Sequence, residues 1–301
     1  MHSRLYLLHA LSALHAGTGQ GSGVIDLPIA REKSTGLPIV PGSSIKGVLR
    51  DEFKGDSNVS AEQHQALFGP DTENAADHAG ALALSDARLL CLPVRSLAGT
   101  FAWVTCPLVL HRFKRDLQAV NPTTELAIPT PEAEGIEVCP SSAVIDNNGM
   151  VLLEDLDLSA TETDAAQAWA ELIGHAFFEF SEWKTLFKDR FAIVDDAMFD
   201  FLAETATEIV TRIRIKQDTR TVAQGGLWFE EHLPAESLLW GIAACDRSRY
   251  DAVTASGAEL LRLLIGEKRL QVGGKASVGR GQARWLLAYG RTEKNGGGLI
   301  A

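Results

Sequence analysis

Hydrophobic and polar positions along the chain follow two spacings, one typical of strands and one of helices. Apolar residues at every second position, or in short apolar runs, predict strands at residues 4–15, 81–94, 101–104, 192–194, 235–245, 269–272 and 285–289. A hairpin is expected over residues 143–157, with its turn at Asn147-Asn148-Gly149. Apolar residues at every third or fourth position predict helices at residues 43–53, 60–68, 107–117, 161–178, 197–205 and 252–266.

The order of these elements predicts an α+β fold. Strand, helix, strands, inserted material, strand, helix, glycine-rich loop and strand are consistent with βαββαβ units on an antiparallel sheet, the ferredoxin-like or RNA-recognition type. We expect one domain over residues 1–301, with insertions at about 55–80 and 118–200, a ribbon at about 207–234 and a flexible tail at 292–301. Residues 121–140 show no periodicity and predict a surface segment. The central strands lack aromatic stacking motifs, so loops and helices would have to hold any RNA.

Composition favours a globular protein of the cytoplasm. The chain of 301 residues is 46% hydrophobic, enough for a large core. Its four cysteines form no C-x-x-C pair, so neither a zinc site nor a disulfide framework is expected. The apolar run at residues 5–14 is interrupted by polar residues and lacks a cleavage site, unlike a signal peptide. No segment reaches the ~20 apolar residues of a membrane span.

Charge narrows the binding chemistry. The formal net charge of −11 argues against a free-standing nucleic-acid-binding protein. Cations nevertheless cluster at Lys46 and Arg50, at residues 212–220 and at residues 268–291. Such a distribution allows one face to bind a polyanion while the rest of the surface is acidic.

The predicted helix at residues 43–53 carries Ser44, Lys46 and Arg50. A serine at 43 or 44 can cap its first N–H groups. Both cations would then lie near the positive end of the helix dipole, where a cation is unfavourable unless an anion is bound. A solvated basic face is the alternative.

Residues 210–216 alternate Ile or Val with cations that include Arg212 and Arg214. This pattern predicts a strand with one cationic and one apolar face, which can lie against phosphates. An edge strand protected by Lys and Arg would show the same alternation.

Two glycine-dense segments stand out. Residues 16–29 form a loop that contains one carboxylate, Asp26. The second segment predicts either a phosphate-binding loop or a long hairpin turn, because glycines let the backbone approach a polyanion but are also common in turns. Its residues of interest are Gly273, Gly274, Lys275, Ser277, Gly279, Arg280 and Gly281.

Three segments together resemble one known family. They are the start through residue 53, the run QGGLWFEEHLP at 224–234 and the run GGKASVGRGQARW at 273–285. They look like the RAMP superfamily, and within it like the repeated, Cas7-like backbone subunit of the type III-B (Cmr) CRISPR effector complex. Type III-B is favoured over its type III-A counterpart by QGGLWFEEHLP.

The resemblance implies a helical filament of copies that grips a guide crRNA, cleaves paired target RNA and joins other Cmr subunits. Asp26 matches the catalytic aspartate of the family, and His15 and Glu230 or Glu231 match positions near that site. The second glycine loop and the helix with Ser44, Lys46 and Arg50 would contact the guide. The ribbon with Arg212 and Arg214 would belong to a thumb, and a helical lid is expected among the insertions.

RNA can be cut by its own 2′-hydroxyl, so the protein need only hold the linkage in line and manage charge and protons. We therefore expect Asp26 to hold a divalent metal, Mg²⁺ or Mn²⁺, or to orient the nucleophile, with a general base as the weaker choice. His15 would suit proton transfer, although a structural histidine is the more common case. Two alternatives stay open, namely a filament subunit without cleavage activity and an enzyme of phosphate-bearing metabolites.

Overall fold

The computed structural model describes residues 1–287 except 20, 22, 75 and 121–124. The strands are β1 (His2–Ala10), β2 (Ile39–Val40), β3 (Leu82–Leu84), β4 (Ala87–Arg95), β5 (Phe101–Thr105), β6 (Gly135–Val138), β7 (Met150–Leu153), β8 (Leu156–Glu162), β9 (Phe191–Val194), β10 (Glu208–Ile215), β11 (Val222–His232), β12 (Leu238–Cys245), β13 (Gly266–Gln271) and β14 (Gln282–Leu287). The helices are α1 (Gly42–Glu52), α2 (Ala61–Phe68), α3 (Pro107–Val120), α4 (Asp164–Phe177), α5 (Ser181–Lys188), α6 (Asp196–Thr205) and α7 (Gly257–Arg262), with short 3-10 turns at Thr72–Asn74 and Ala276–Val278.

One large, mostly antiparallel sheet organises the described part of the chain. Its strand order is β13-β14-β1-β12-β4-β5-β9-β6-β8-β7, and β2 and β3 pair with β4 and β12. The α+β class with an antiparallel core is therefore confirmed.

β1 is a central strand, as its two apolar faces predict. It pairs antiparallel with β12 on one side and β14 on the other, and residues 5–10 are buried. Tyr6 lies opposite Gly241, where an added Cβ would stand 2.4 Å from the Tyr6 ring. Glycine at this position lets the Tyr6 ring cross the neighbouring strand. The Tyr6 hydroxyl then donates a hydrogen bond to the Ser85 carbonyl at 2.7 Å.

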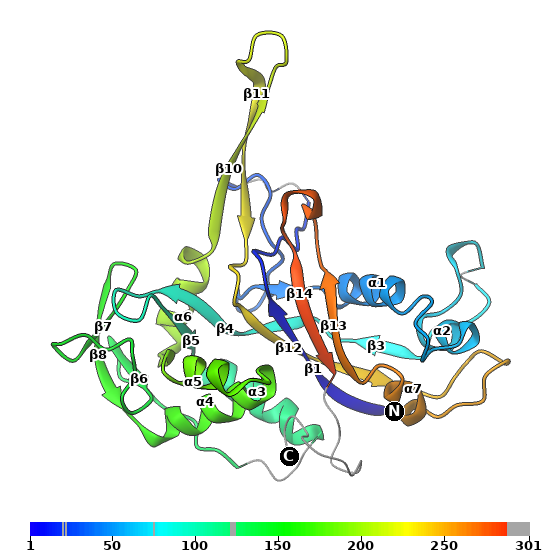
Figure 1. Ribbon diagram of the computed structural model, residues 1–301, viewed down its shortest axis with the longest axis horizontal. Helices are drawn as coiled ribbons and strands as arrows, with labels where there is room; N and C mark the ends of the chain where they lie inside the picture. The colour runs from blue at the N-terminus through cyan, green and yellow to red at the C-terminus, as the bar shows by residue number, and fades with distance from the viewer. Residues whose placement is uncertain (20, 22, 75, 121–124, 288–301) are drawn as a thin grey trace.

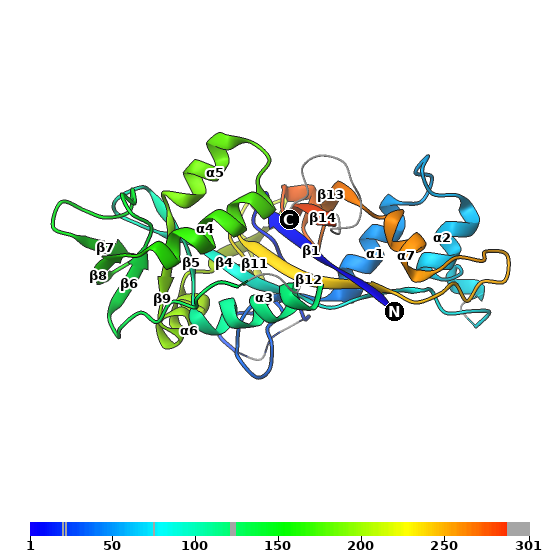
Figure 2. The same ribbon diagram turned by 90° about the horizontal axis from the view of Figure 1, so that it is seen from below.

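Helices α3, α4 and α5 lie on the side of the sheet opposite the β10–β11 ribbon (Figures 1 and 2). Phe113 of α3 contacts Trp169 of α4 and Trp240 of β12, so these helices share one aromatic core with the sheet. The helices α1, α2 and α7 gather at the other end of the molecule, near the N-terminus (Figure 1).

The ribbon formed by β10 and β11 extends away from the sheet (Figure 1). The two strands pair with each other in a separate two-stranded sheet, and β11 also forms an isolated bridge between Glu230 and Leu27 of the preceding loop region. In a two-stranded sheet each strand has an unpaired edge, so the edge-strand interpretation of the alternating pattern stays open beside the phosphate-binding one. Ile209, Ile213 and Ile215 are exposed, because no helix or strand in the described part of the chain covers this face of the ribbon.

Two local predictions are wrong, the hairpin over residues 143–157 and the surface segment at residues 121–140. The turn at residues 147–149 is present, but Asp146 accepts hydrogen bonds from the N–H groups of Asn148 and Met150 and closes it locally. The hairpin is β7–β8 instead, because a turn signal does not fix which neighbouring residues pair. Within residues 121–140, β6 is part of the sheet, between β8 and β9.

The observed starts of two helices differ from the predicted ones, because capping side chains determine where each helix begins. Thr163 caps α4, so the helix begins at Asp164, and residues 161–162 belong to β8. Ser256 forms a capping box with Glu259, so α7 begins at Gly257 and not at the predicted residue 252, and the helix ends at Arg262. Helix α5 is not predicted from the sequence.

Two further predictions fall partly or wholly outside the described residues. These are the end of the strand at 285–289 and the flexible tail at 292–301. Among the described residues, no helix combines the length and the apolar character that a membrane crossing needs.

Candidate functional site

Three segments that are distant in the sequence meet at the base of the ribbon (Figure 1). They are the first loop (residues 11–31), the end of β11 and the glycine loop (residues 272–281). Backbone hydrogen bonds join them: the N–H of Gly274 donates to the His15 carbonyl at 3.0 Å, and Leu14 and Leu233 exchange two bonds. The sequence predicted functional roles in all three segments, and the fold brings them into one cluster.

Asp26 lies on this first loop, beside β11. Its side chain is exposed, and its Oδ2 accepts a hydrogen bond from the backbone N–H of Phe229 at 2.8 Å. The adjoining backbone also pairs with β11, because Leu27 N–H donates to the Phe229 carbonyl and Glu231 N–H donates to the Leu27 carbonyl. Asp26 thus presents a solvent-accessible carboxylate from a fixed backbone.

His15 is buried between the first loop and the glycine loop. Its Nδ1 lies 2.7 Å from the Glu231 carbonyl, so Nδ1 carries the hydrogen of that bond. A Cβ at Gly17 would lie 2.6 Å from His15 Nε2, and one at Gly273 would lie 2.2 Å from the His15 carbonyl oxygen. These glycines let two loops close around the ring, which explains part of the glycine density in both segments.

Glu230 connects the ribbon to the glycine loop. Its side chain is 1% exposed, and its two oxygens accept from Lys275 and Trp228 at 2.7 Å and from Arg212 at 3.3 Å. Burial alone would raise the pKa of this carboxyl, but these donors, Lys275 foremost, outweigh burial and hold the pKa at about 2. Its catalytic role stays a prediction. Its contacts hold the ribbon and the glycine loop together.

Glu231 points to the other face of β11 and contacts the first loop. Its Oε2 accepts from the Ile29 N–H at 3.0 Å, and its Oε1 accepts from Arg31 and, at 3.1 Å, from Thr207. Directly after the first loop, Glu32 accepts two hydrogen bonds from Arg112 of α3, which attaches this end of the loop to the helix.

His232 is a member of this cluster that the sequence reasoning missed. It is fully buried, its ring lies 5.4 Å from that of His15, and neither ring nitrogen has a hydrogen-bond partner within the described residues. Burial, together with the nearby Arg280 and His15, lowers its pKa to about 4. The period of two along a strand could have found it, since Glu230 and His232 share one face.

Three of the four predicted RNA-binding cations of the ribbon and glycine loop make internal contacts in this structure. Lys275 and Arg212 pair with Glu230, and Arg280 lies 3.3 Å from Glu208. Arg214 is exposed on the ribbon, and Ser277, Gly274 and Gly279 are exposed on the glycine loop. Gly281 is buried, with a φ of 81° that favours glycine.

The cations of α1 are not part of this cluster. Lys46 donates to the Leu82 carbonyl at 2.6 Å, and Arg50 donates to the Pro70 carbonyl and to Asp71. Arg50 lies in the last turn of α1, where the helix dipole favours a cation, so the dipole argument for a bound anion is wrong at this residue. Burial lowers the pKa of Lys46.

The start of α1 also differs from the prediction. The helix begins at Gly42, whose N–H donates to Asp86 at 2.8 Å, and no side chain of its N-cap residue Pro41 contributes. Ser43 and Ser44 are therefore not caps. Both are exposed within the first turn.

Residues 7–284 match the model of the RAMP superfamily. The chain belongs to this superfamily. It is 38% identical over 302 residues to the CRISPR system Cmr endoribonuclease Cmr4 of Pyrococcus furiosus, covering 99% of each chain. It is 26% identical to the CRISPR system CMR subunit Cmr4 of Saccharolobus solfataricus, covering 93% of this chain and 96% of that one.

Solved structures agree with this assignment. Oligomeric Cmr4 from Pyrococcus furiosus has a TM-score of 0.73 at 30% identity and covers 95% of this chain and 98% of its own. A chain of the type III-B Cmr-beta complex bound to cognate target RNA shares the fold, with a TM-score of 0.74 at 20% identity and coverage of 95% and 97%. The predicted RAMP family, and within it the Cmr4-like subunit, is confirmed.

For this RAMP protein, the divalent metal stays a prediction. Within the described residues, no three or more His, Cys, Asp or Glu side chains gather in a way that could hold a metal ion. Asp26 is exposed and can supply one oxygen ligand, and Mg²⁺ is commonly held by one or two carboxylates together with substrate phosphates and water. The residues therefore fit an ion whose other ligands come from RNA and solvent.

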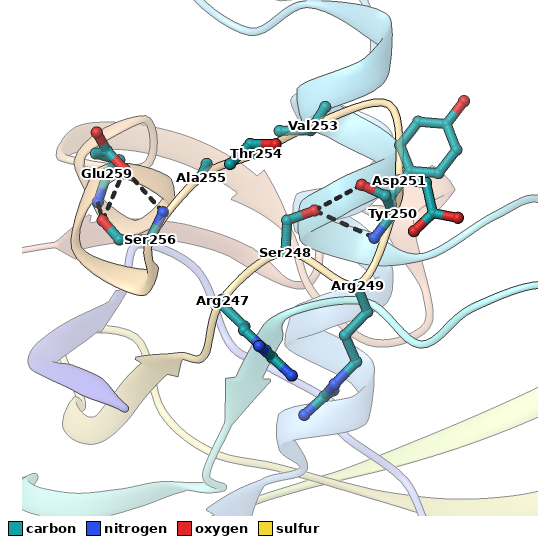
Figure 3. A pocket seen from close by; sticks show the side chains of 10 residues that line it. All are labelled: Arg247, Ser248, Arg249, Tyr250, Asp251, Val253, Thr254, Ala255, Ser256 and Glu259. Atoms are coloured by element: carbon teal, nitrogen blue, oxygen red, sulfur yellow. Dashed lines mark hydrogen bonds between the residues drawn. The ribbon is translucent and has the colours of Figure 1, made fainter.

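A cavity of about 840 Å³ lies apart from this site, beside α7, and is lined by residues 247–251 and 253–256 and by Glu259 (Figure 3). Ser248 exchanges hydrogen bonds with the Tyr250 backbone, and Ser256 does so with Glu259. Arg247 and Arg249 extend from the same side of the loop (Figure 3). Tyr250 also stacks on His78, with ring centroids 4.7 Å apart.

Proposed function

We propose that this chain is the repeated backbone subunit of an RNA-guided type III-B CRISPR effector and that it cleaves target RNA as an endoribonuclease. The observation that carries the proposal is the position of Asp26. This carboxylate is exposed at the foot of a cationic ribbon, in a chain related over its whole length to an endoribonuclease. Asp26 lies at the surface, where a long RNA strand can reach it.

The chemistry requires little from the protein besides geometry. The 2′-hydroxyl next to the cut linkage attacks the phosphorus, and the 5′-oxygen of the following nucleotide leaves. A carboxylate is an acceptor only, so Asp26 can orient that hydroxyl or hold a divalent ion against the phosphate. The Phe229 N–H fixes Oδ2, and the exposed side of the carboxylate faces solvent, where RNA can approach.

The guide crRNA and the target RNA are the proposed partners, together with further copies of the chain and other Cmr subunits. Guide contacts are assigned to the exposed part of the glycine loop and to the ribbon. Phosphate contacts position a strand without reading its sequence, so guides of different sequence should bind alike. The proposed location is the cytoplasm.

A reconstituted complex with guide RNA, complementary target RNA and Mg²⁺ tests the proposal. Guide-dependent cleavage that stops when the metal is chelated supports both the activity and the metal. Cleavage that continues without metal removes the metal from the proposal. Tight guide and target binding without any cleavage favours the alternative of a non-catalytic filament subunit.

A further inference from the structure

Glu231 of the ribbon contacts the first loop through both its backbone and its side chain. The backbone of Glu231 binds the Leu27 carbonyl, and its carboxylate binds the Ile29 N–H and Arg31. Thr207, directly before β10, donates to the same carboxylate. The buried Glu231 thus binds every second residue of the segment that directly follows Asp26, namely Leu27, Ile29 and Arg31.

The strand that carries Glu231 also carries the N–H group that holds Asp26. Phe229 is two residues before Glu231 on β11, and its N–H donates to Asp26 Oδ2 at 2.8 Å. The register between β11 and the loop therefore determines whether this bond forms. Any shift of the loop along β11 moves the Asp26 carboxylate away from the Phe229 N–H.

We infer that Glu231 is a positioning residue for Asp26: it fixes the register of the loop and so the place of the carboxylate. This inference rests on the proposed function of Asp26. Glu231 is 2% exposed and its oxygens are occupied by protein donors, so it does not contact RNA. Its effect on cleavage passes through the loop.

Glutamine tests the role with little change in shape. The two carboxylate oxygens of Glu231 both accept, one from Ile29 and the other from Arg31 and Thr207. An amide has one acceptor oxygen and one NH₂ group, which only donates. In Glu231→Gln this NH₂ group must therefore face either the Ile29 N–H or the Arg31 guanidinium, and two donors form no hydrogen bond. The loop must then move, and displacements of about 1 Å can slow a reaction by roughly 100-fold.

Asp116→Asn is the matched control. Asp116 is similarly buried and accepts from Arg88 and Trp240 on one oxygen and from Arg115 on the other. It lies on α3 and has no contact with the first loop. Both variants should lower the thermal unfolding temperature. Glu231→Gln weakens contacts of the first loop, whereas Asp116→Asn weakens contacts between α3 and the sheet.

The experiment measures single-turnover cleavage at saturating target in the assembled complex, RNA affinity, and hydrogen–deuterium exchange of peptides covering residues 23–32 and 226–232. We expect Glu231→Gln to slow cleavage by about 10- to 100-fold, with RNA affinity within about twofold, and to speed exchange in both peptides. Asp116→Asn should leave the cleavage rate and both peptides unchanged. Arg31→Gln, which keeps the bond from Ile29 to Glu231, should give a smaller loss of the same kind.

The outcomes separate the positioning role from the proposed function. If the unaltered complex does not cleave RNA, the proposed function fails, and the exchange data alone decide whether Glu231 holds the loop. Cleavage by Glu231→Gln at the unaltered rate, or unchanged exchange near residues 23–32, overturns the positioning role. Equal losses of cleavage in Glu231→Gln and Asp116→Asn also overturn it, because general destabilisation would then explain both.

Discussion

Replacing Glu230 with glutamine removes the buried charge that links the ribbon to the glycine loop. Against the cost of burial, its hydrogen bonds with Lys275, Trp228 and Arg212 hold the pKa at about 2, compared with an ordinary value of 4.5. At ~1.36 kcal/mol for each pKa unit, this favours the ionised form by roughly 3 kcal/mol in the folded protein. Lys275 and Arg212 are each 32% exposed, which weakens their contribution. We therefore expect a loss of about 1–3 kcal/mol in the free energy of unfolding.

Urea unfolding of both proteins at neutral pH measures this loss, and a pH series tests its cause. Because the folded-state pKa of Glu230 is depressed, its stabilisation is fully present above about pH 4.5 and is lost as the pH falls towards about 2. The stability difference between the two proteins should therefore narrow below about pH 4.5. Glu208→Gln is the control, since its pairing with Arg280 is 3.3 Å long and Glu208 is 41% exposed. It should cost under about 1 kcal/mol.

A Glu230→Gln protein as stable as the unaltered one would refute this reasoning. So would a stability difference that stays constant from pH 6 to pH 3. If Glu230 transfers a proton during cleavage, the glutamine variant would instead keep its stability and lose cleavage activity.

Two further predictions concern neighbours of this cluster. Gly273→Ala should destabilise the fold by more than about 1 kcal/mol, because Gly273 has a φ of 78° and an added Cβ would lie 2.2 Å from the His15 carbonyl oxygen. Gly274→Ala, whose Cβ would meet its nearest neighbour at 3.7 Å, is the control, and equal melting temperatures for the two would contradict the argument. His232→Phe should flatten the pH dependence of stability between about pH 6.5 and 4, because the buried His232 is held neutral with a pKa of about 4 and the unfolded chain takes up a proton first. Unfolding curves that change equally with pH in both proteins would show that His232 does not contribute.

Much of the fold follows from local sequence patterns, and the errors have a common cause. β9, α2 and α6 are predicted within one residue of their observed bounds, because their apolar spacing reports burial directly. The first strand is predicted as a strand but ends at Ala10, before the expected residue 15. The β7–β8 hairpin and β6 are not predicted, since strand pairing is decided by partners distant in the sequence. The alternation at residues 210–216 predicts the two faces of the ribbon, but it does not predict that the apolar face stays exposed in the described structure.

The candidate site shows the same division. Asp26 and the glycine loop are recognisable from residue type and from family resemblance. The network around Glu230 and Glu231 is not, because its donors are spread along the sequence from Ile29 to Lys275. Lys46 and Arg50 show the opposite error: their spacing indicates an anion site, whereas their contacts in the structure are with carbonyl groups and Asp71.

Cleavage by an Asp26→Asn complex tests the central claim most directly. Asparagine keeps an oxygen that can accept from the Phe229 N–H, so the loop and the fold should be retained while the charge is lost. In an assembled complex with guide and radiolabelled complementary RNA, we expect cleavage to fall by at least about 100-fold, with guide and target affinity unchanged. Cleavage at the unaltered rate would contradict the role of Asp26, and loss of guide or target binding would show that Asp26 supports assembly instead of catalysis.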